Sequence, residues 1–261
     1  MCLLLVAYGC RSDYPLIVAA NRDEFHARPA EAMHWWSDPA VLGGRDSQAG
    51  GSWFVVDRYA RFAAVTNFRD PASNEGRRTR GELPLRAVAG SSVTDLEALA
   101  ADGDAYSPFN LLAGDPQRVG YVSSRCPSVD ELPRGVHGLS NGCLNAAWPK
   151  IHRGRAMLGA LAQSPDEPSA EHVLAGLHDR HQPRDELLPD TGVGLERERL
   201  LSPAFIISPE YGTRCSTVLM VSAKGEVSVT ERWFDADGQT VGTYRQSFRA
   251  GAPGAGAAPS E

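Results

Sequence analysis

Apolar runs along the chain predict strands near both ends. Residues 2–9 and 16–20 are apolar and rich in branched side chains, and a polar turn separates them, which is typical of a hairpin of two buried strands. Residues 50–57 and 61–68 form a second hairpin-like pair. Further strands are predicted at 109–115, 118–124, 204–208, 216–223, 226–234 and 240–248.

Helical periodicity is concentrated in the middle of the chain. It predicts helices at 82–90, 92–103, 148–164 and 169–179. Strands paired in hairpins with helices between them indicate an α+β protein with mostly antiparallel sheet. We expect one domain over residues 1–248. The small residues and prolines of 249–261 cannot bury enough surface to order themselves, so we expect a disordered tail there.

Composition excludes several classes of protein. The 261 residues carry a formal net charge of −6, which disfavours binding to nucleic acid phosphates. No apolar segment approaches the length of a membrane span. The five cysteines are odd in number and show no CxxC pair, so we expect reduced thiols, a cytoplasmic protein, and neither a disulfide framework nor a zinc site. They are Cys2, Cys10, Cys126, Cys143 and Cys215.

Common catalytic and cofactor motifs are absent from the sequence. There is no HExxH, no GxGxxG after a strand, no GxxxxGK[ST] and no GxSxG. We therefore expect no bound metal, no nucleotide cofactor and no α/β-hydrolase triad.

Cys2 is the remaining candidate for chemistry. After removal of Met1 it would carry both a thiol and a free α-amine. An α-amine has an ordinary pKa of about 7.7–8.0, which suits a general base near neutral pH. One residue would then supply a nucleophile and its base. The alternative is that Cys2 only begins a buried strand, which cysteine does well.

The polar tetrapeptide Asn21–Glu24 favours the catalytic interpretation. It ends the apolar run 16–20 abruptly, and a hairpin would bring this end beside Cys2. Asp23 could then hold or orient the N-terminal amine. The alternative is a charged surface turn.

Several segments together resemble one family. MCLLLVAYGC, NRDEFHARPA, LGGRD, GGSWFVV, AAVTNFRDP, TRGEL, GLSNGCLNAAWPK and YGTRCSTVLMV follow one another in the same order as in the NRDE family, the homologues of transport and Golgi organisation protein 2. The resemblance runs from residue 1 to about 235. It implies an N-terminal-nucleophile hydrolase fold, a four-layer α/β/β/α sandwich with antiparallel sheets.

A more distant resemblance links the chain to cysteine hydrolases such as penicillin V acylase and conjugated bile acid hydrolase. These proteins begin Met-Cys and carry an Arg-Asn-x-Asp run, whose last part matches Asn21 and Asp23. Its arginine falls on Ala20, and this chain has Arg22 instead. The resemblance implies that Asn67 and Asn141 are oxyanion donors.

The same resemblance suggests substrate-binding residues. Arg214 is a candidate for the closing arginine of those hydrolases, and Asn21 is expected near the substrate. Trp35 and Trp36 form an aromatic pair that would either line a groove for an apolar ligand or anchor a covered loop.

Two functions follow as hypotheses. The first is an N-terminal cysteine amidohydrolase that cleaves an amide or thioester of a small or acyl-bearing substrate and needs no cofactor. The second is a non-catalytic carrier of haem or of a lipid or acyl-CoA, because NRDE relatives are linked to haem trafficking and lipid homeostasis. Cys2, a histidine or Cys126 would then be an axial haem ligand.

Overall fold

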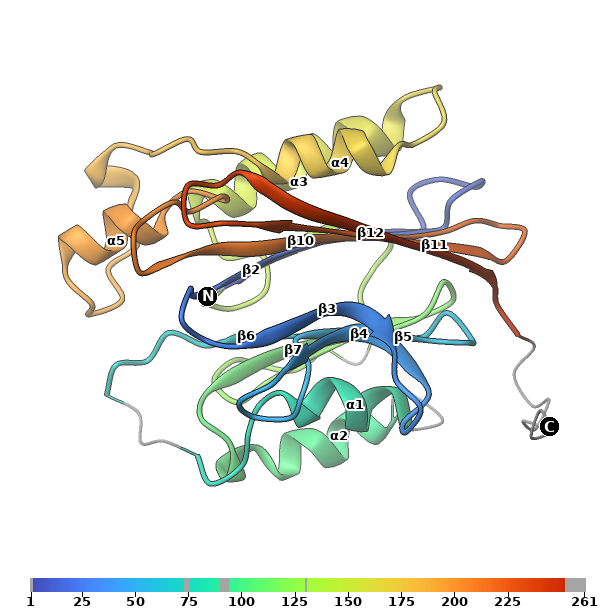
Figure 1. Ribbon diagram of the computed structural model, residues 1–261, viewed down its shortest axis with the longest axis horizontal. Coiled ribbons are helices and arrows are strands. Elements are labelled where there is room, and N and C mark those ends of the chain that lie inside the picture. Colours follow the sequence, from blue (N-terminus) through green and yellow to red (C-terminus); the bar gives the residue numbers. More distant parts are fainter. Residues whose placement is uncertain (1, 73–75, 90–93, 130, 252–261) are drawn as a thin grey trace.

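The computed structural model describes residues 2–72, 76–89, 94–129 and 131–251. Two six-stranded antiparallel sheets are stacked face to face in this part of the chain (Figure 1). One sheet has the strand order β12-β11-β10-β2-β1-β9, and the other has the order β3-β4-β5-β6-β7-β8.

The first sheet contains β1 (Cys2–Tyr8), β2 (Leu16–Phe25), β9 (Gly135–Leu139), β10 (Tyr211–Val221), β11 (Glu226–Phe234) and β12 (Thr240–Arg249). The second contains β3 (Ala30–Trp35), β4 (Val41–Asp46), β5 (Phe54–Asp57), β6 (Phe62–Asn67), β7 (Phe109–Gly114) and β8 (Val119–Ser123).

Helices cover the outer face of each sheet. α3 (Pro149–Gln163) and α4 (Ala170–Leu177) pack on the first sheet, and α1 (Glu82–Ala89) and α2 (Thr94–Ala101) pack on the second (Figure 1). A short fifth helix, α5 (Leu195–Leu201), precedes β10. The predicted four-layer α/β/β/α sandwich is therefore confirmed.

The apolar run of β1 follows from burial on both of its faces. Leu4 and Val6 point into the core between the sheets, whereas Leu3 and Leu5 pack under α3 and α4. Successive strand residues face opposite sides, so a central strand of a covered sheet needs apolar residues at every position. This explains why the N-terminal hairpin was recognisable from sequence.

The polar tetrapeptide does not end its strand, contrary to the sequence-based expectation. β2 continues through it to Phe25 and pairs with β1 on one side and β10 on the other. β1 pairs with Asn21 and Arg22 only, whereas β10 pairs with the whole tetrapeptide and supplies polar partners to Asn21 and Asp23.

Other elements also differ from the predictions. Residues 204–208 form no strand, because the Ile206 N–H and carbonyl bond the hydroxyl and N–H of Thr213, while Phe205 stacks on His178. β3, β4, β9 and α5 were not predicted. β3 alternates only partly between exposed and buried positions, and β4 contains two adjacent glycines, which weaken a strand pattern.

The prediction of five reduced cysteines is wrong for two of them. Cys126 and Cys143 form a disulfide that joins the segment after β8 to the segment after β9. The two cysteines are 17 residues apart in the sequence, and β8 and β9, which precede them, belong to different sheets. Cys10 is half-buried and Cys215 is buried, and both keep reduced thiols.

The last strand, β12, ends one residue beyond the predicted domain end at 248. Arg249 belongs to β12 and pairs with Glu226, and the Ala250 N–H donates to the Gly225 carbonyl. The predicted disorder of the remaining tail falls on 252–261, outside the described residues. None of the helices in the described part of the chain combines the length and apolar character that a membrane crossing requires.

Candidate functional site

The start of β1 lies in a row of residues that crosses four strands. Cys2 is the Cα partner of Arg22, Arg22 of Cys215, and Cys215 of Trp233. The predicted hairpin therefore does bring the tetrapeptide to Cys2. The side chain of Cys2 lies outside the described part of the structure, so its role as nucleophile stays a prediction.

Arg22 points from this row toward the second sheet. Its guanidinium lies 4.2 Å from the ring centroid of Trp53, and its Nη2 is 3.6 Å from Asp46 Oδ2. The side chain is only 5% exposed, and its Nη1 has no hydrogen-bond partner among the described residues. A buried donor that stays unpaired costs about 1–3 kcal/mol.

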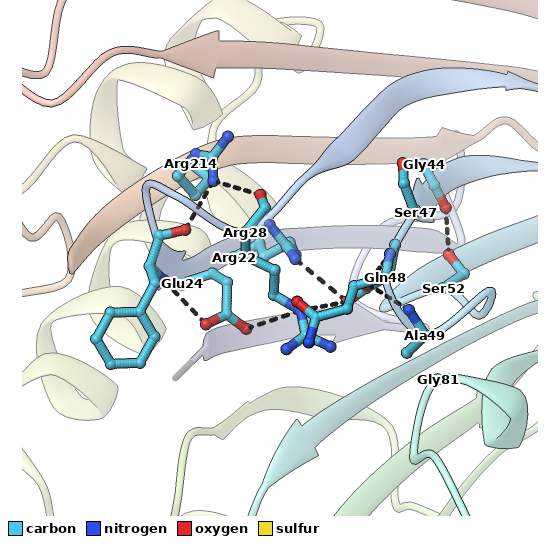
Figure 2. Close-up of polar contacts among 12 residues, drawn as sticks. Arg22, Glu24, Arg28, Gly44, Ser47, Gln48, Ala49, Ser52, Gly81 and Arg214 are labelled. Atoms are coloured by element: carbon cyan, nitrogen blue, oxygen red, sulfur yellow. Dashed lines mark hydrogen bonds and ion pairs between the residues drawn. The ribbon is translucent and has the colours of Figure 1, made fainter. Parts of the chain in front are cut away.

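Asp46 holds a second arginine beside the first (Figure 2). Its Oδ2 accepts a 2.7 Å hydrogen bond from Arg28 Nε, and its Oδ1 accepts from the backbone N–H of Ala49. Burial by itself would raise the pKa of Asp46, but the bonds from Arg28 and Ala49 keep it below its ordinary value. Asp46 is therefore an anion that orients two guanidinium groups.

Asp23 is buried one position further along β2. Its Oδ1 accepts a 2.7 Å hydrogen bond from the Thr213 hydroxyl. Burial raises the pKa of the Asp23 carboxyl, while the charge of Lys150 and the Thr213 bond oppose that rise. Asp23 thus lies at the end of the strand pair that contains Cys2, as its predicted role in orienting the amine requires.

Asn21 has a structural role in this arrangement. Its Nδ2 donates to the carbonyls of Leu177 and Ala204, and its Oδ1 accepts from the Ser216 hydroxyl. It faces the helix layer and does not line the pocket described below. The geometry gives no support to its predicted contact with a substrate.

Asn67 and Asn141 are brought together. Asn141 Nδ2 donates a 2.8 Å hydrogen bond to the Asn67 carbonyl, and the Asn141 carbonyl accepts from the Arg69 N–H. Asn141 is buried, whereas Asn67 lines the pocket. Their predicted service as oxyanion donors stays a prediction.

A buried network that the sequence did not reveal supports this pair. Asn110 donates to the carbonyl of Gly142 and accepts from the Tyr121 hydroxyl, and Thr66 donates to the carbonyl of Ser140. The network connects β6 and β7 of the second sheet to the segment that follows β9 of the first. It fixes the backbone on both sides of Asn141.

The tryptophan pair anchors the second sheet. Trp36 is buried among side chains packed under α1 and α2, and Trp35 packs against Arg58 and Phe248. Neither residue lines the pocket. These contacts are those of covered anchors, and the groove-lining alternative stays a prediction.

Arg214 occupies a bulge in β10. The register with β2 shifts between Thr213 and Cys215, which leaves Arg214 as the extra residue. Its Nη1 donates to the carbonyls of Phe25 and Arg28, and burial lowers the pKa of its guanidinium. Arg214 thus holds the turn that carries Arg28, and its predicted contact with a substrate stays a prediction.

These elements surround a polar pocket of about 210 Å³ between the sheets. Four arginines and three carboxylates line it, together with Asn67, and Trp53 and Val65 are its apolar residues. Arg28, Asp46 and Arg80 in this lining were not expected from the sequence. The signal that could have found them is the arginine and aspartate content of NRDEFHARPA, LGGRD and TRGEL.

The described residues that line the pocket offer haem iron no ligand. The residues that the structure places around the pocket include no histidine, cysteine, methionine or tyrosine, which are the side chains that ligate haem iron. Cys126, named above as a haem ligand, is bonded to Cys143 and offers no thiolate. Within the described residues, no three histidine, cysteine or acidic side chains are grouped to hold a metal ion.

Two stacked antiparallel sheets covered by helices on both outer faces, with the N-terminal strand central and beside a polar pocket, define the N-terminal-nucleophile hydrolase fold. The structure is similar to that of a mutant conjugated bile acid hydrolase from Clostridium perfringens, with a TM-score of 0.52 and 10% sequence identity, over 95% of this chain and 92% of the other. Residues 1–236 match the family Transport and Golgi organisation 2, and the chain belongs to that family.

Full-length relatives confirm the membership. The Transport and Golgi organization protein 2 homolog of Bos taurus is 32% identical over 257 residues, which cover 89% of this chain and 92% of the relative. The Homo sapiens homolog is 30% identical over 256 residues with the same coverage.

Proposed function

We propose that the chain is an N-terminal cysteine hydrolase that cleaves an amide or thioester bond in a small or acyl-bearing substrate. The observation that carries the proposal is the register of Cys2 opposite Arg22 at the edge of a pocket that also contains Asn67. This register supports a site in which the predicted nucleophile, a positive charge and an amide donor act together.

The chemistry begins with removal of Met1, which frees the α-amine of Cys2. The amine takes the thiol proton while the sulfur attacks the substrate carbonyl, and a carbon–sulfur bond forms. The resulting ammonium gives the proton to the departing amine or thiol, which leaves an acyl-cysteine. A water molecule, deprotonated by the same amine, then attacks the acyl carbon, and the sulfur leaves as the free acid forms.

The oxyanion formed in each step needs donors. Asn67 lines the pocket and is assigned this role, and Asn141 keeps it in place through the bond to its carbonyl. One well-placed donor of this kind contributes about 2.7–4 kcal/mol to the transition state.

Arg22 and Asp23 act on Cys2 from neighbouring positions of β2. The guanidinium of Arg22 favours the thiolate over the thiol by its positive charge. Asp23 pairs with the ammonium and orients the amine. Both side chains line the same pocket, so each can serve a different group of Cys2.

Intact-mass spectrometry of the native protein tests the proposal. We expect loss of Met1 and, after incubation with a panel of acyl thioesters and amides, an added acyl mass that maps to Cys2. Cys2→Ala should abolish the adduct, and Cys10→Ala should not, because Cys10 is also partly accessible but lies outside the pocket. Retained Met1, or an adduct that survives Cys2→Ala, would contradict the proposal.

The carrier hypothesis has one observation in its favour. A groove of about 470 Å³ between α3 and α4, on the helix side of the first sheet, is lined in part by the apolar residues Leu3, Leu5 and Met157. An apolar ligand bound there would be unaffected by Cys2→Ala. Saturable binding of a fluorescent fatty acid that is lost in Ala175→Trp, in the absence of any Cys2 adduct, would favour a lipid carrier over the hydrolase.

A further inference from the structure

The polar pocket is richer in positive than in negative side chains. Its four arginines are Arg22, Arg28, Arg78 and Arg80, and three carboxylates accompany them. Glu82, outside the lining, pairs with Arg78. What favours an anion here is therefore the hydrogen-bond donors that Arg22 and Arg28 leave unused.

Not all of these guanidinium groups are used by the protein itself. Arg78 is bound to Glu82 through two nitrogens. Arg28 uses its Nε on Asp46, and no hydrogen bond from its two terminal nitrogens is found among the described residues. Arg22 is buried with an unpartnered Nη1. Arg22 and Arg28 thus share one carboxylate and keep donors to spare.

The opposite wall of the pocket is fixed in place. It is the segment that carries Arg80 and Gly81, of which Gly81 is labelled in Figure 2. The Ser52 N–H donates to the Gly81 carbonyl at 2.8 Å, and a Cβ on Gly51 would lie only 2.4 Å from the Gly81 carbonyl carbon. Because Trp53 follows Ser52 directly, this wall is tied to the ring on which Arg22 stacks.

We propose that this pocket is an anion subsite, in which Arg22 and Arg28 on one wall and Arg80 on the other bind a carboxylate or phosphate of the ligand. Guanidinium groups match the oxygens of both anions in paired hydrogen bonds. The assignment of that anion to a substrate rests on the proposed hydrolase function. Since Cys2 and Arg22 are Cα partners, the anionic group lies within a few bonds of the scissile carbonyl.

Calorimetric titration of the full chain tests the subsite without any chemistry at Cys2. The probes are sodium phosphate and disodium succinate, with sodium chloride at matched ionic strength as the reference. The variant is Arg28→Gln, which removes a partly exposed side chain and so spares the core. The matched control is Arg58→Gln, an exposed arginine that stacks on Trp35 away from the pocket.

We expect at least one probe to bind the wild type, with affinity lowered about tenfold or more in Arg28→Gln and unchanged in Arg58→Gln, since a charge-assisted hydrogen bond is lost. Tighter binding of phosphate or of succinate identifies the anion. Binding no tighter than that of chloride, or equal losses in both variants, overturns the subsite.

Failure of the subsite and failure of the hydrolase are distinguishable. Arg28-dependent anion binding without a Cys2 adduct would leave the subsite standing and remove the hydrolase. Equal adduct formation from neutral and anionic thioesters, with no anion binding, would leave the hydrolase standing and remove the subsite.

Discussion

The side-chain amide of Asn141 donates a 2.8 Å hydrogen bond to the backbone carbonyl of Asn67. Asn67 ends β6 of one sheet, and Asn141 follows β9 of the other. The bond therefore joins the two sheets at the rim of the polar pocket. It makes the position of one predicted oxyanion donor depend on the other.

Asn141→Ala should accordingly reduce both stability and activity. The Asn67 carbonyl loses its donor, which costs about 1–3 kcal/mol in the free energy of unfolding. Formation of the Cys2 adduct should slow by about tenfold or more, because Asn67 is no longer held in place. Urea denaturation and timed mass spectrometry measure the two effects. Unchanged adduct kinetics would remove Asn141 from the site.

Asn21→Ala should affect stability alone. The substitution orphans the Leu177 and Ala204 carbonyls and the Ser216 hydroxyl, so we expect a loss of about 1–3 kcal/mol. The rate of acylation per folded molecule should stay at the wild-type value. A selective loss of rate in a variant of wild-type stability would show that Asn21 contacts the substrate after all.

Reduction of the Cys126–Cys143 disulfide should destabilise the protein. A disulfide that closes a loop of about this length adds roughly 3 kcal/mol to the free energy of unfolding, because it restricts the unfolded chain. The native protein should be 2 Da lighter than the reduced protein, about the mass of two hydrogens. Reductant should lower the melting temperature of the wild type and leave that of Cys126→Ser/Cys143→Ser unchanged. Equal native and reduced masses would contradict the pairing.

Cys2 should be the fastest cysteine to react with iodoacetamide once Met1 is removed. Cys215 is buried, burial raises the pKa of the half-buried Cys10 thiol, and the disulfide protects Cys126 and Cys143. Timed labelling with peptide mapping gives the order, and Asp23→Ala should alter the rate at Cys2 only. If Cys2 is labelled no faster than Cys10, Cys2 is only the first residue of a strand and not a nucleophile.

Glu231→Gln should change how stability depends on pH. Burial raises the pKa of Glu231, although bonds from Trp233 and the Met33 N–H oppose this. Because the pKa of Glu231 is higher in the folded than in the unfolded state, the protonated carboxyl stabilises the fold. This stabilisation is complete below the unfolded pKa of about 4.3 and is lost as pH rises through the folded pKa. Relative to wild type, the glutamine variant should therefore gain stability as pH rises.

Urea denaturation across the acidic to neutral range measures this difference. Glu171→Gln is the matched control, because hydrogen bonds from Arg232 and Arg245 lower the pKa of that exposed carboxyl. The difference in stability between Glu171→Gln and the wild type should not change with pH above the ordinary pKa of glutamate. A flat difference for Glu231→Gln as well would contradict the raised pKa.

Local patterns in the sequence determined the fold class and the meeting of Cys2 with the tetrapeptide. The strands of the N-terminal hairpin are apolar because both sheet faces are covered, and a short turn leaves few ways to pair them. The helices of the middle region were equally visible, because their periodicity depends only on near neighbours.

The tertiary structure decided which polar residues share a site. Arg22 and Asn21 are adjacent in the sequence, yet strand alternation sends Arg22 to the pocket and Asn21 to the helix layer. A bulge takes Arg214 out of the alternation of side chains along β10. Asp46 and Arg80 reach the pocket from other segments of the chain. Such contacts depend on the register between strands that are distant in the sequence. A shift of one residue moves every side chain of a strand to the opposite face of the sheet, and no local pattern specifies the register.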